Sequence, residues 1–269
     1  MRSVMSFIAT FFAAYVIILL LMFLFQDKLL FMPHAGFLQT PQSVGLSAED
    51  IWVEADDGVK LHAWYFPHET SNKVIVLSHG NAGNISYRLD IARSLLNAGA
   101  SVVMYDYRGY GKSEGRPTEK GLYMDIRAFT EYLIQEMDYS EGDIYMYGRS
   151  LGGAVAAYAA TQFDVGGLVL DSSFKNLKSM IGDVYPFVPK FLAKYEFPTE
   201  KYLRKLDGTP VLIMHSPDDE IVGYHNGEFL YQVAGDPKQF VELRGGHNDN
   251  FFSSRDLIES HWAEFLNRY

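Results

Sequence analysis

The stretch 147–153 restricts the fold of this chain more than any other. It carries the pattern Gly-x-Ser-x-Gly with Ser150 at its centre. The apolar run 143–146 before it predicts a buried strand, and the alanine-rich run 154–160 after it predicts a helix. Glycines permit a turn too sharp for side chains, so the pattern predicts that Ser150 is held out at the tip of a strand-to-helix turn. Its hydroxyl would then lie near a helix N-terminus, where backbone N–H groups favour developing negative charge. The alternative is a glycine-rich turn that merely carries a surface serine.

Length and composition narrow the class of protein. At 269 residues, one α/β domain with an appendage is expected rather than two full domains. The formal net charge of -10 argues against a nucleic-acid partner and against a polybasic membrane patch. The chain has no cysteine, which excludes disulfides, thiolate nucleophiles and cysteine metal sites.

The N-terminus predicts a membrane anchor. Residues 5–25 carry no charge and are nearly all apolar, and about 20 such residues suffice for a helix to cross ~30 Å of hydrocarbon. A cleaved signal peptide would need a shorter apolar core and a small-residue cleavage site, but the only small pair, Ala13-Ala14, lies in the middle of the run. A buried core helix is the other alternative, and an apolar run of this length at the N-terminus is rarely one. We therefore expect an uncleaved single-pass anchor over residues 1–28 and one folded α/β domain over residues 29–269.

The charges that flank the apolar run give a weak orientation signal. Arg2 and the terminal amine lie on one side and Lys28 on the other. Positive charge favours the cytoplasmic side, so the N-terminus is predicted to be cytoplasmic and the catalytic domain extracytoplasmic, which means periplasmic if the source is bacterial.

The rest of the chain alternates strand and helix patterns. Residues 26–41 are expected to form an amphipathic connector that lies against the domain or the lipid interface. The pattern around Asp56-Asp57-Gly58 is typical of a hairpin. Further strands are predicted at 73–78, 102–106, 167–170, 211–214 and 239–243, with helices at 88–98, 119–137, 228–233 and 257–266. Such alternation predicts an α/β fold with a mostly parallel, doubly covered sheet and an active site at the carboxyl ends of the strands.

Residues 172–206 form a long interval between two predicted strands. The interval is rich in aromatic residues, and Pro186, Pro189 and Pro198 divide it into short pieces. Its position suggests a small helical cap that forms an acyl pocket. Ordinary core packing of connecting helices is an equal alternative.

A serine hydroxyl needs a base to become a nucleophile, and the sequence offers one. His247 lies in a glycine-rich loop directly after the strand that ends at Leu243. A carboxylate to orient it is available in the turn after strand 211–214, where Asp218 and Asp219 are neighbours and the residues alone do not decide between them. Nucleophile, acid and histidine thus follow in the order that a strand-to-helix serine turn requires, each at a strand end.

An oxyanion formed during acyl transfer needs two preorganised N–H donors. One is expected from Leu151, the residue after the serine. The other is expected from Asn81, in the loop 79–84 after the strand 73–78. The alternative is that the loop 79–84 is only a tight turn.

Nucleotide and metal sites are not indicated. Gly111-Lys112-Ser113 ends like a phosphate-binding loop, but Asp106 stands where its first glycine is required. The third glycine of a dinucleotide fingerprint is likewise replaced, by Glu114. In the acidic turn 218–220, consecutive side chains point apart, so no metal site is predicted there.

With these residues in place, the chain resembles the α/β-hydrolase superfamily, and within it the membrane-anchored bud-emergence-type branch that includes α/β-hydrolase domain-containing proteins 13 and 17. The motifs that carry the resemblance are HGNAGN at 79–84, YDYRGYGKSEG at 105–115 and GRSLGG at 148–153. In the superfamily the acid strand usually ends His-Gly-x-x-Asp-x-x-Val, which places Asp219 as the acid, although Ser216 stands where glycine is usual. Some relatives remove palmitate from proteins and use a cysteine-rich N-terminus for their own lipidation, a feature that this cysteine-free chain lacks.

The resemblance implies a serine hydrolase of acyl esters or thioesters that needs no cofactor and no metal. Ser150, Asp219 and His247 would be catalytic, and the N–H groups of Asn81 and Leu151 would hold the oxyanion. The expected partners are a small or lipid-like acyl substrate and the membrane, with no nucleic acid and no indication of a protein partner. A serine peptidase of related fold and a non-catalytic membrane-tethered binding protein are the alternatives.

Overall fold

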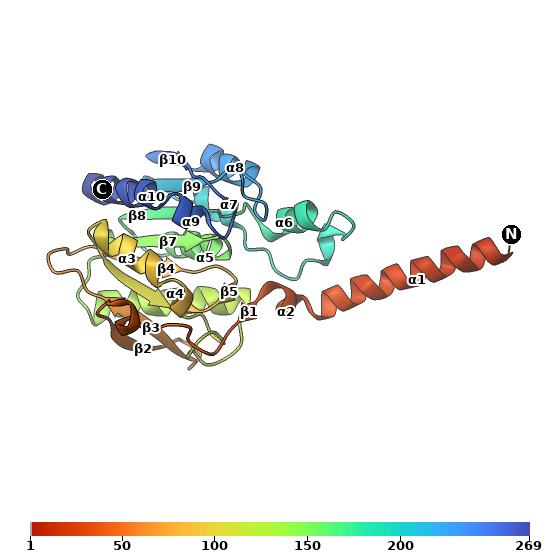
Figure 1. Ribbon diagram of the computed structural model, residues 1–269, viewed down its shortest axis with the longest axis horizontal. Helices are drawn as coiled ribbons and strands as arrows, with labels where there is room; N and C mark the ends of the chain where they lie inside the picture. The colour runs from red at the N-terminus through yellow and green to blue at the C-terminus, as the bar shows by residue number, and fades with distance from the viewer. Residues whose placement is uncertain (1) are drawn as a thin grey trace.

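The computed structural model describes residues 2–269, with a central eight-stranded sheet in the order β10-β9-β8-β7-β4-β6-β3-β2 (Figure 1). Only the pairs β2–β3 and β3–β6 are antiparallel, so the predicted mostly parallel sheet is confirmed. The strands are β2 (Glu49–Glu54), β3 (Lys60–Phe66), β4 (Val74–Ser78), β6 (Ser101–Tyr105), β7 (Ile144–Arg149), β8 (Gly167–Asp171), β9 (Val211–His215) and β10 (Lys238–Glu242).

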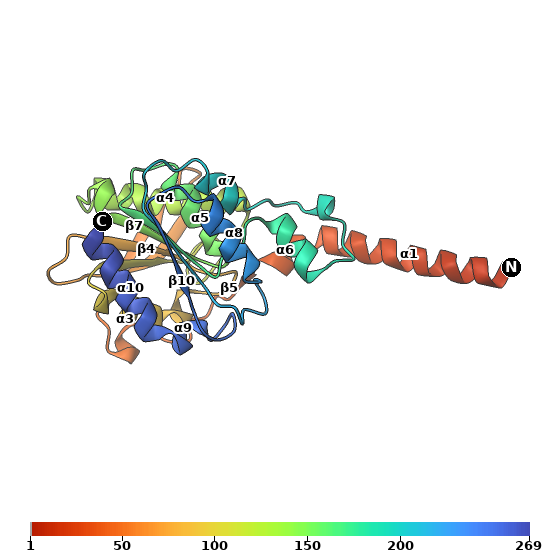
Figure 2. The same ribbon diagram turned by 90° about the horizontal axis from the view of Figure 1, so that it is seen from above.

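Helices cover both faces of the sheet, as Figure 2 shows. Every residue of the five central strands β4, β6, β7, β8 and β9 is buried, as expected of parallel strands with helices on either side. One face carries α4 (Glu119–Gln135), α5 (Leu151–Ala160), α7 (Thr199–Leu203) and α8 (His225–Val233), and the other carries α3 (Leu89–Asn97), α9 (Asn250–Ser253) and α10 (Arg255–Arg268).

The strand-to-helix turn differs in its bounds from the sequence prediction. β7 continues through Arg149 instead of ending at residue 146, and α5 begins at Leu151 instead of residue 154. The strand pairs on both sides up to this point, since Gly148 lies opposite Ser78 and Leu170. Hydrophobic patterns do not include glycines in strands or helices, so the sequence placed these boundaries too far from the serine.

The N-terminal helix α1 (Arg2–Leu24) extends away from the domain, with the two termini at opposite ends of the molecule (Figure 1). Its segment Val4–Leu24 is long and apolar enough to cross a membrane, and none of it is buried against the rest of the protein. Length and composition therefore agree with the predicted anchor.

The connector after α1 is more ordered than the sequence suggests. A short helix α2 (Gln26–Leu30) leads into β1 (Met32–Pro33), which pairs in parallel with β5 (Ala82–Gly83). A two-residue strand leaves no periodic signal, so this pairing was not predicted. It ties the connector to the loop that follows β4.

The segment 172–206 contains α6 (Leu177–Val184), the short turn η4 (Lys190–Leu192) and α7. α7 packs on α5, and Phe174 and Phe197 are buried in the core. α6 and η4 instead project towards the end of α1 nearest the domain (Figures 1 and 2). The hydroxyl of Tyr15 donates to the Phe187 carbonyl at 2.7 Å, which joins the projection to α1.

The crossing of β7 under α5 depends on Gly148. A Cβ at this position would lie 2.3 Å from the Gly152 carbonyl oxygen and 2.5 Å from the Gly153 Cα, both backbone atoms that have no side-chain freedom to move aside. We predict that Gly148→Ala destabilises the domain by about 1–3 kcal/mol or more through overpacking. In a thermal melt of the full chain in detergent micelles, the midpoint should fall by roughly 2–10 °C.

The matched control is Gly142→Ala, because a Cβ there meets no atom within 4 Å. Its midpoint should stay at the wild-type value. Equal midpoints for Gly148→Ala and wild type would mean that α5 can move away from β7 at little cost, which contradicts the close packing at Gly148.

Candidate active site

Ser150 occupies the tip of the turn in a conformation that side chains rarely adopt, with φ 53° and ψ -118°. Such a residue is strained, and it persists only where its surroundings fix it. The Ser150 N–H donates to the Asp171 carbonyl at 2.8 Å, and its carbonyl accepts the Ser173 hydroxyl at 3.0 Å. These bonds to the end of β8 hold the serine in place.

His247 reaches Ser150 from the loop after β10. Its Nε2 lies 3.2 Å from the Ser150 Oγ, and its Nδ1 lies 2.7 Å from the Asp219 Oδ2. The structure thus brings together three predicted residues that are 97 and 28 positions apart in the chain. In this chain of hydrogen bonds, the histidine can accept the serine proton while the carboxylate holds the ring in one orientation.

Of the two neighbouring aspartates, Asp218 and Asp219, only Asp219 contacts the imidazole ring of His247. Its side chain is buried, and its Oδ1 accepts the N–H groups of Ile221 at 3.0 Å and Val222 at 2.7 Å. Although burial alone would raise the pKa of Asp219, the hydrogen bond to His247 and the further bond from Val222 hold that pKa below its usual value. Asp219 therefore stays ionised at neutral pH, whereas the side chain of Asp218 is exposed.

Two residues that sequence reasoning missed fix the histidine loop. The Glu220 carboxylate accepts the His247 N–H at 2.9 Å. The buried Arg149 guanidinium donates to Asp171 at 2.5 Å, to Asn250 at 2.9 Å and to the His247 carbonyl. Burial alone would lower the pKa of Arg149, but the Asp171 carboxylate raises it above its usual value. Position 149 is a variable one in Gly-x-Ser-x-Gly, so the pattern gave no signal for this role.

The two residues predicted to donate to the oxyanion, Asn81 and Leu151, line the same pocket as Ser150. A Cβ on Gly80 would lie 3.7 Å from the Ser150 Cβ, which places the loop after β4 beside the serine. Within the described residues, the N–H groups of Asn81 and Leu151 donate to no protein acceptor, as an oxyanion hole requires.

The loop that carries Asn81 is held rigidly. The hydroxyl of Tyr110 donates to the Asn81 carbonyl at 2.8 Å, and the Asn81 side chain donates to the Leu30 carbonyl at 3.0 Å. Burial lowers the pKa of His79 to about 4, so this neighbour is neutral at pH 7. The connector found in the fold therefore helps to position the loop.

A pocket of about 390 Å³ opens beside Ser150. Its lining is mostly apolar, and it includes the two basic residues Arg88 and Arg149. Among the described residues that line it, there is no Asp or Glu side chain. The lining consists of Leu30, Met32, Asn81, Ala82, Arg88, Arg149, Ser150, Leu151, Phe174, Leu177, Met180, Ile221, Val222, His247 and Asn248.

Comparison with known proteins places this geometry in a family. A family model described as serine aminopeptidase, S33, matches residues 69–204. The α/β-hydrolase domain-containing protein WAV2 of Arabidopsis thaliana is 33% identical over 273 residues, which cover 91% of this chain and 88% of WAV2. An uncharacterized membrane protein of Saccharomyces cerevisiae is 32% identical over 237 residues, 84% of each chain.

Solved structures agree with the fold. The esterase Pf2001 of Pyrococcus furiosus superposes with a TM-score of 0.74 at 21% identity and covers 88% of this chain and 99% of its own. Since the family model spans half of the sequence and WAV2 matches nearly all of it, the chain belongs to the α/β-hydrolase family.

Proposed function

We propose that this chain is a membrane-anchored serine hydrolase that cleaves acyl esters or thioesters. Membership of the α/β-hydrolase family and the likeness to an esterase fold support a hydrolase of the ester type. The observation that carries the finer proposal is the hydrogen-bonded series from Ser150 through His247 to Asp219. A binding module has no physical need of all three groups in this arrangement.

The first half of the proposed reaction forms an acyl-enzyme. The Ser150 oxygen attacks the acyl carbonyl carbon while His247 Nε2 takes the hydroxyl proton. The carbonyl oxygen becomes negatively charged and is held by the N–H groups of Asn81 and Leu151, each of which is typically worth ~10²–10³ in kcat. The bond to the leaving alcohol or thiol then breaks, and His247 supplies its proton.

The second half releases the acid. A water molecule gives its proton to His247 and attacks the acyl carbon, the oxyanion forms again in the same place, and the Ser150 oxygen leaves with the proton from His247. Asp219 remains ionised throughout and stabilises the imidazolium in both halves.

A serine aminopeptidase is the second candidate, because the matching family model carries that description. An aminopeptidase must recognise the positive ammonium group of a peptide N-terminus, for which a carboxylate is the natural partner. The pocket lining has no such group among the described residues, and its charged members are Arg88 and Arg149. This charge pattern favours an ester or thioester over a peptide amine.

Membrane anchoring through α1 is part of the proposal. The helix has the length and composition to span a bilayer, and one relative is named a membrane protein. We propose a single-pass anchor with the catalytic domain outside the cytoplasm, which for a bacterial source is the periplasm.

The nucleophile is tested with p-nitrophenyl esters of increasing chain length. Ser150→Ala should lower kcat by roughly 10³–10⁶ because the acyl-enzyme can no longer form. Ser140→Ala replaces an exposed serine without a side-chain capping bond and should retain wild-type rates. The proposal of a serine hydrolase would be contradicted if the folded wild type hydrolysed no ester and were not labelled by a serine-reactive phosphonate. Cleavage of aminoacyl amides alone would favour the peptidase.

The acid is tested by comparing two neighbouring substitutions. Asp219→Asn should lower kcat by roughly 10²–10⁴, since the neutral amide no longer stabilises the imidazolium or fixes its tautomer. Asp218→Asn should leave kcat near the wild-type value because that side chain is exposed. The opposite pattern in the same ester assay would assign the role to Asp218.

The orientation is tested by fusing a reporter after Tyr269. Alkaline phosphatase, which folds only outside the cytoplasm, should be active in this fusion. A fluorescent protein that matures in the cytoplasm should show no fluorescence when fused at the same position. Activity of the cytoplasmic reporter alone would reverse the proposed topology.

A further inference from the structure

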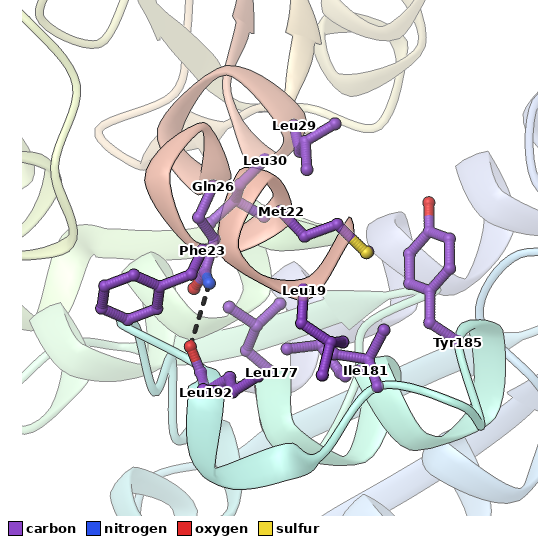
Figure 3. Close-up of a pocket in the computed structure, with 11 residues that line it drawn as sticks. Leu19, Met22, Phe23, Gln26, Leu29, Leu30, Leu177, Ile181, Tyr185 and Leu192 are labelled. Atoms are coloured by element: carbon purple, nitrogen blue, oxygen red, sulfur yellow. Dashed lines mark hydrogen bonds between the residues drawn. The ribbon is translucent and has the colours of Figure 1, made fainter. Parts of the chain in front are cut away.

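A second apolar cavity, of about 110 Å³, lies where the domain meets α1 (Figure 3). One wall comes from the last turns of α1 and from α2, and the other from α6 and η4. The side chains that define the two walls are Leu19, Met22 and Leu30 on one side and Leu177, Ile181 and Leu192 on the other. We call this space the anchor groove.

The anchor groove adjoins the catalytic pocket. Leu30 and Leu177 line both cavities, so the two spaces share a wall on each side. Ser150 lies in the second of them. The anchor groove is therefore the immediate neighbour of the pocket that contains the proposed nucleophile.

The side-chain amide at the anchor groove is already paired. The Gln26 amide lies at its edge, where it donates to the Leu192 carbonyl at 3.1 Å and accepts the Lys194 N–H at 2.6 Å. Both polar atoms of the amide are therefore engaged with the backbone of the 172–206 segment. The two bonds clip this segment to α2 and leave the space between them to apolar atoms.

The 172–206 segment also contacts α1 outside the anchor groove. Tyr15 in α1 and Gln26 in α2 both bond to the 172–206 segment. The segment therefore runs beside the half of α1 that is nearest the domain.

Exposed aromatic side chains occur on the same projection. Phe187 is 54% exposed and Phe191 82% exposed, which is costly in water but favourable at a lipid interface. The contact with Tyr15 of α1 and the exposed aromatic residues are independent observations, and both place the projection beside the proposed membrane span.

We propose that the anchor groove binds the acyl chain of a membrane lipid ester, which enters from the leaflet beside α1 and presents its carbonyl to Ser150. The proposal rests on the proposed function of Ser150 as the nucleophile. A long chain that slides from the leaflet into this space stays in apolar surroundings throughout, so it avoids the unfavourable transfer through water that a soluble enzyme imposes. The alcohol leaves with the proton from His247, and water later releases the fatty acid.

The occupant follows from the position of the anchor groove. The anchor groove lies between the pocket of the proposed nucleophile and a helix that has the composition of a membrane span. Its walls are mostly aliphatic. A protein segment would bring backbone polar groups that these walls do not satisfy. An alkyl chain has none.

The test narrows the anchor groove with Met22→Trp or, from the opposite wall, Ile181→Trp. The control is Leu20→Trp, because two residues along a helix turn the side chain by about 200°, and Leu20 is 53% exposed outside the anchor groove. The full chain is reconstituted in phosphatidylcholine vesicles, and hydrolysis of p-nitrophenyl palmitate and p-nitrophenyl butyrate is compared. Each groove variant should lower the ratio of palmitate to butyrate kcat/KM at least tenfold, and the control should keep the wild-type ratio.

A second measurement uses alkyl fluorophosphonates of increasing chain length as inactivators. With wild type the inactivation rate should rise with chain length, and in the groove variants the rise should stop at a shorter chain. Unchanged ratios and unchanged chain-length profiles in both groove variants would overturn the proposed route while leaving the hydrolase intact. If wild type hydrolyses neither ester and reacts with no fluorophosphonate, the proposed function itself fails.

Discussion

The close approach of β7 and α5 is the constraint on which the rest of the site depends. Gly148 in β7 leaves no room for a Cβ beneath α5, where it would lie 2.3 Å from the Gly152 carbonyl oxygen, and Gly152 is packed as closely on β4, where a Cβ would lie 2.0 Å from the Ser78 carbonyl oxygen. This contact forces the chain from strand to helix within one residue, and that residue is Ser150 with its positive φ of 53°. The strain is compensated by hydrogen bonds to the end of β8 and by the buried packing of the helix. The reactive position is thus fixed by backbone geometry before any side chain is considered.

A buried cation then ties the other strand ends to this turn. Arg149 binds Asp171 at the end of β8, and it also binds Asn250 and the carbonyl of His247 in the loop after β10. A buried guanidinium is costly unless each of its donors finds a partner, so these elements can adopt only arrangements that satisfy it. Arg149, the residue before Ser150, therefore helps to set the distance from His247 to Ser150. The loop of His247 cannot shift without breaking its hydrogen bonds to Arg149.

Much of this organisation could be predicted from the sequence because it depends on local patterns. The glycines around Ser150 and the position of His247 after a strand both follow from the chain read in order. The acid illustrates the limit: Asp218 and Asp219 have the same chemistry, and which one points inwards depends on the turn that Val222 and Ile221 make around the carboxylate. The resemblance to the superfamily selected Asp219, whereas the residues alone did not.

The contacts that the sequence did not reveal join segments far apart in the chain, and they connect the N-terminal helices to the site. Gln26 meets Leu192 across 166 positions, and the side chain of Asn81 binds the Leu30 carbonyl across 51. The same loop is paired to the connector through β1 and β5. The end of α2 therefore supports one proposed oxyanion donor and forms part of the wall of the catalytic pocket. It follows that α2 has a structural role beyond linking α1 to the domain, because its Leu30 carbonyl holds the side chain of Asn81 and its Leu30 side chain lines the pocket of Ser150.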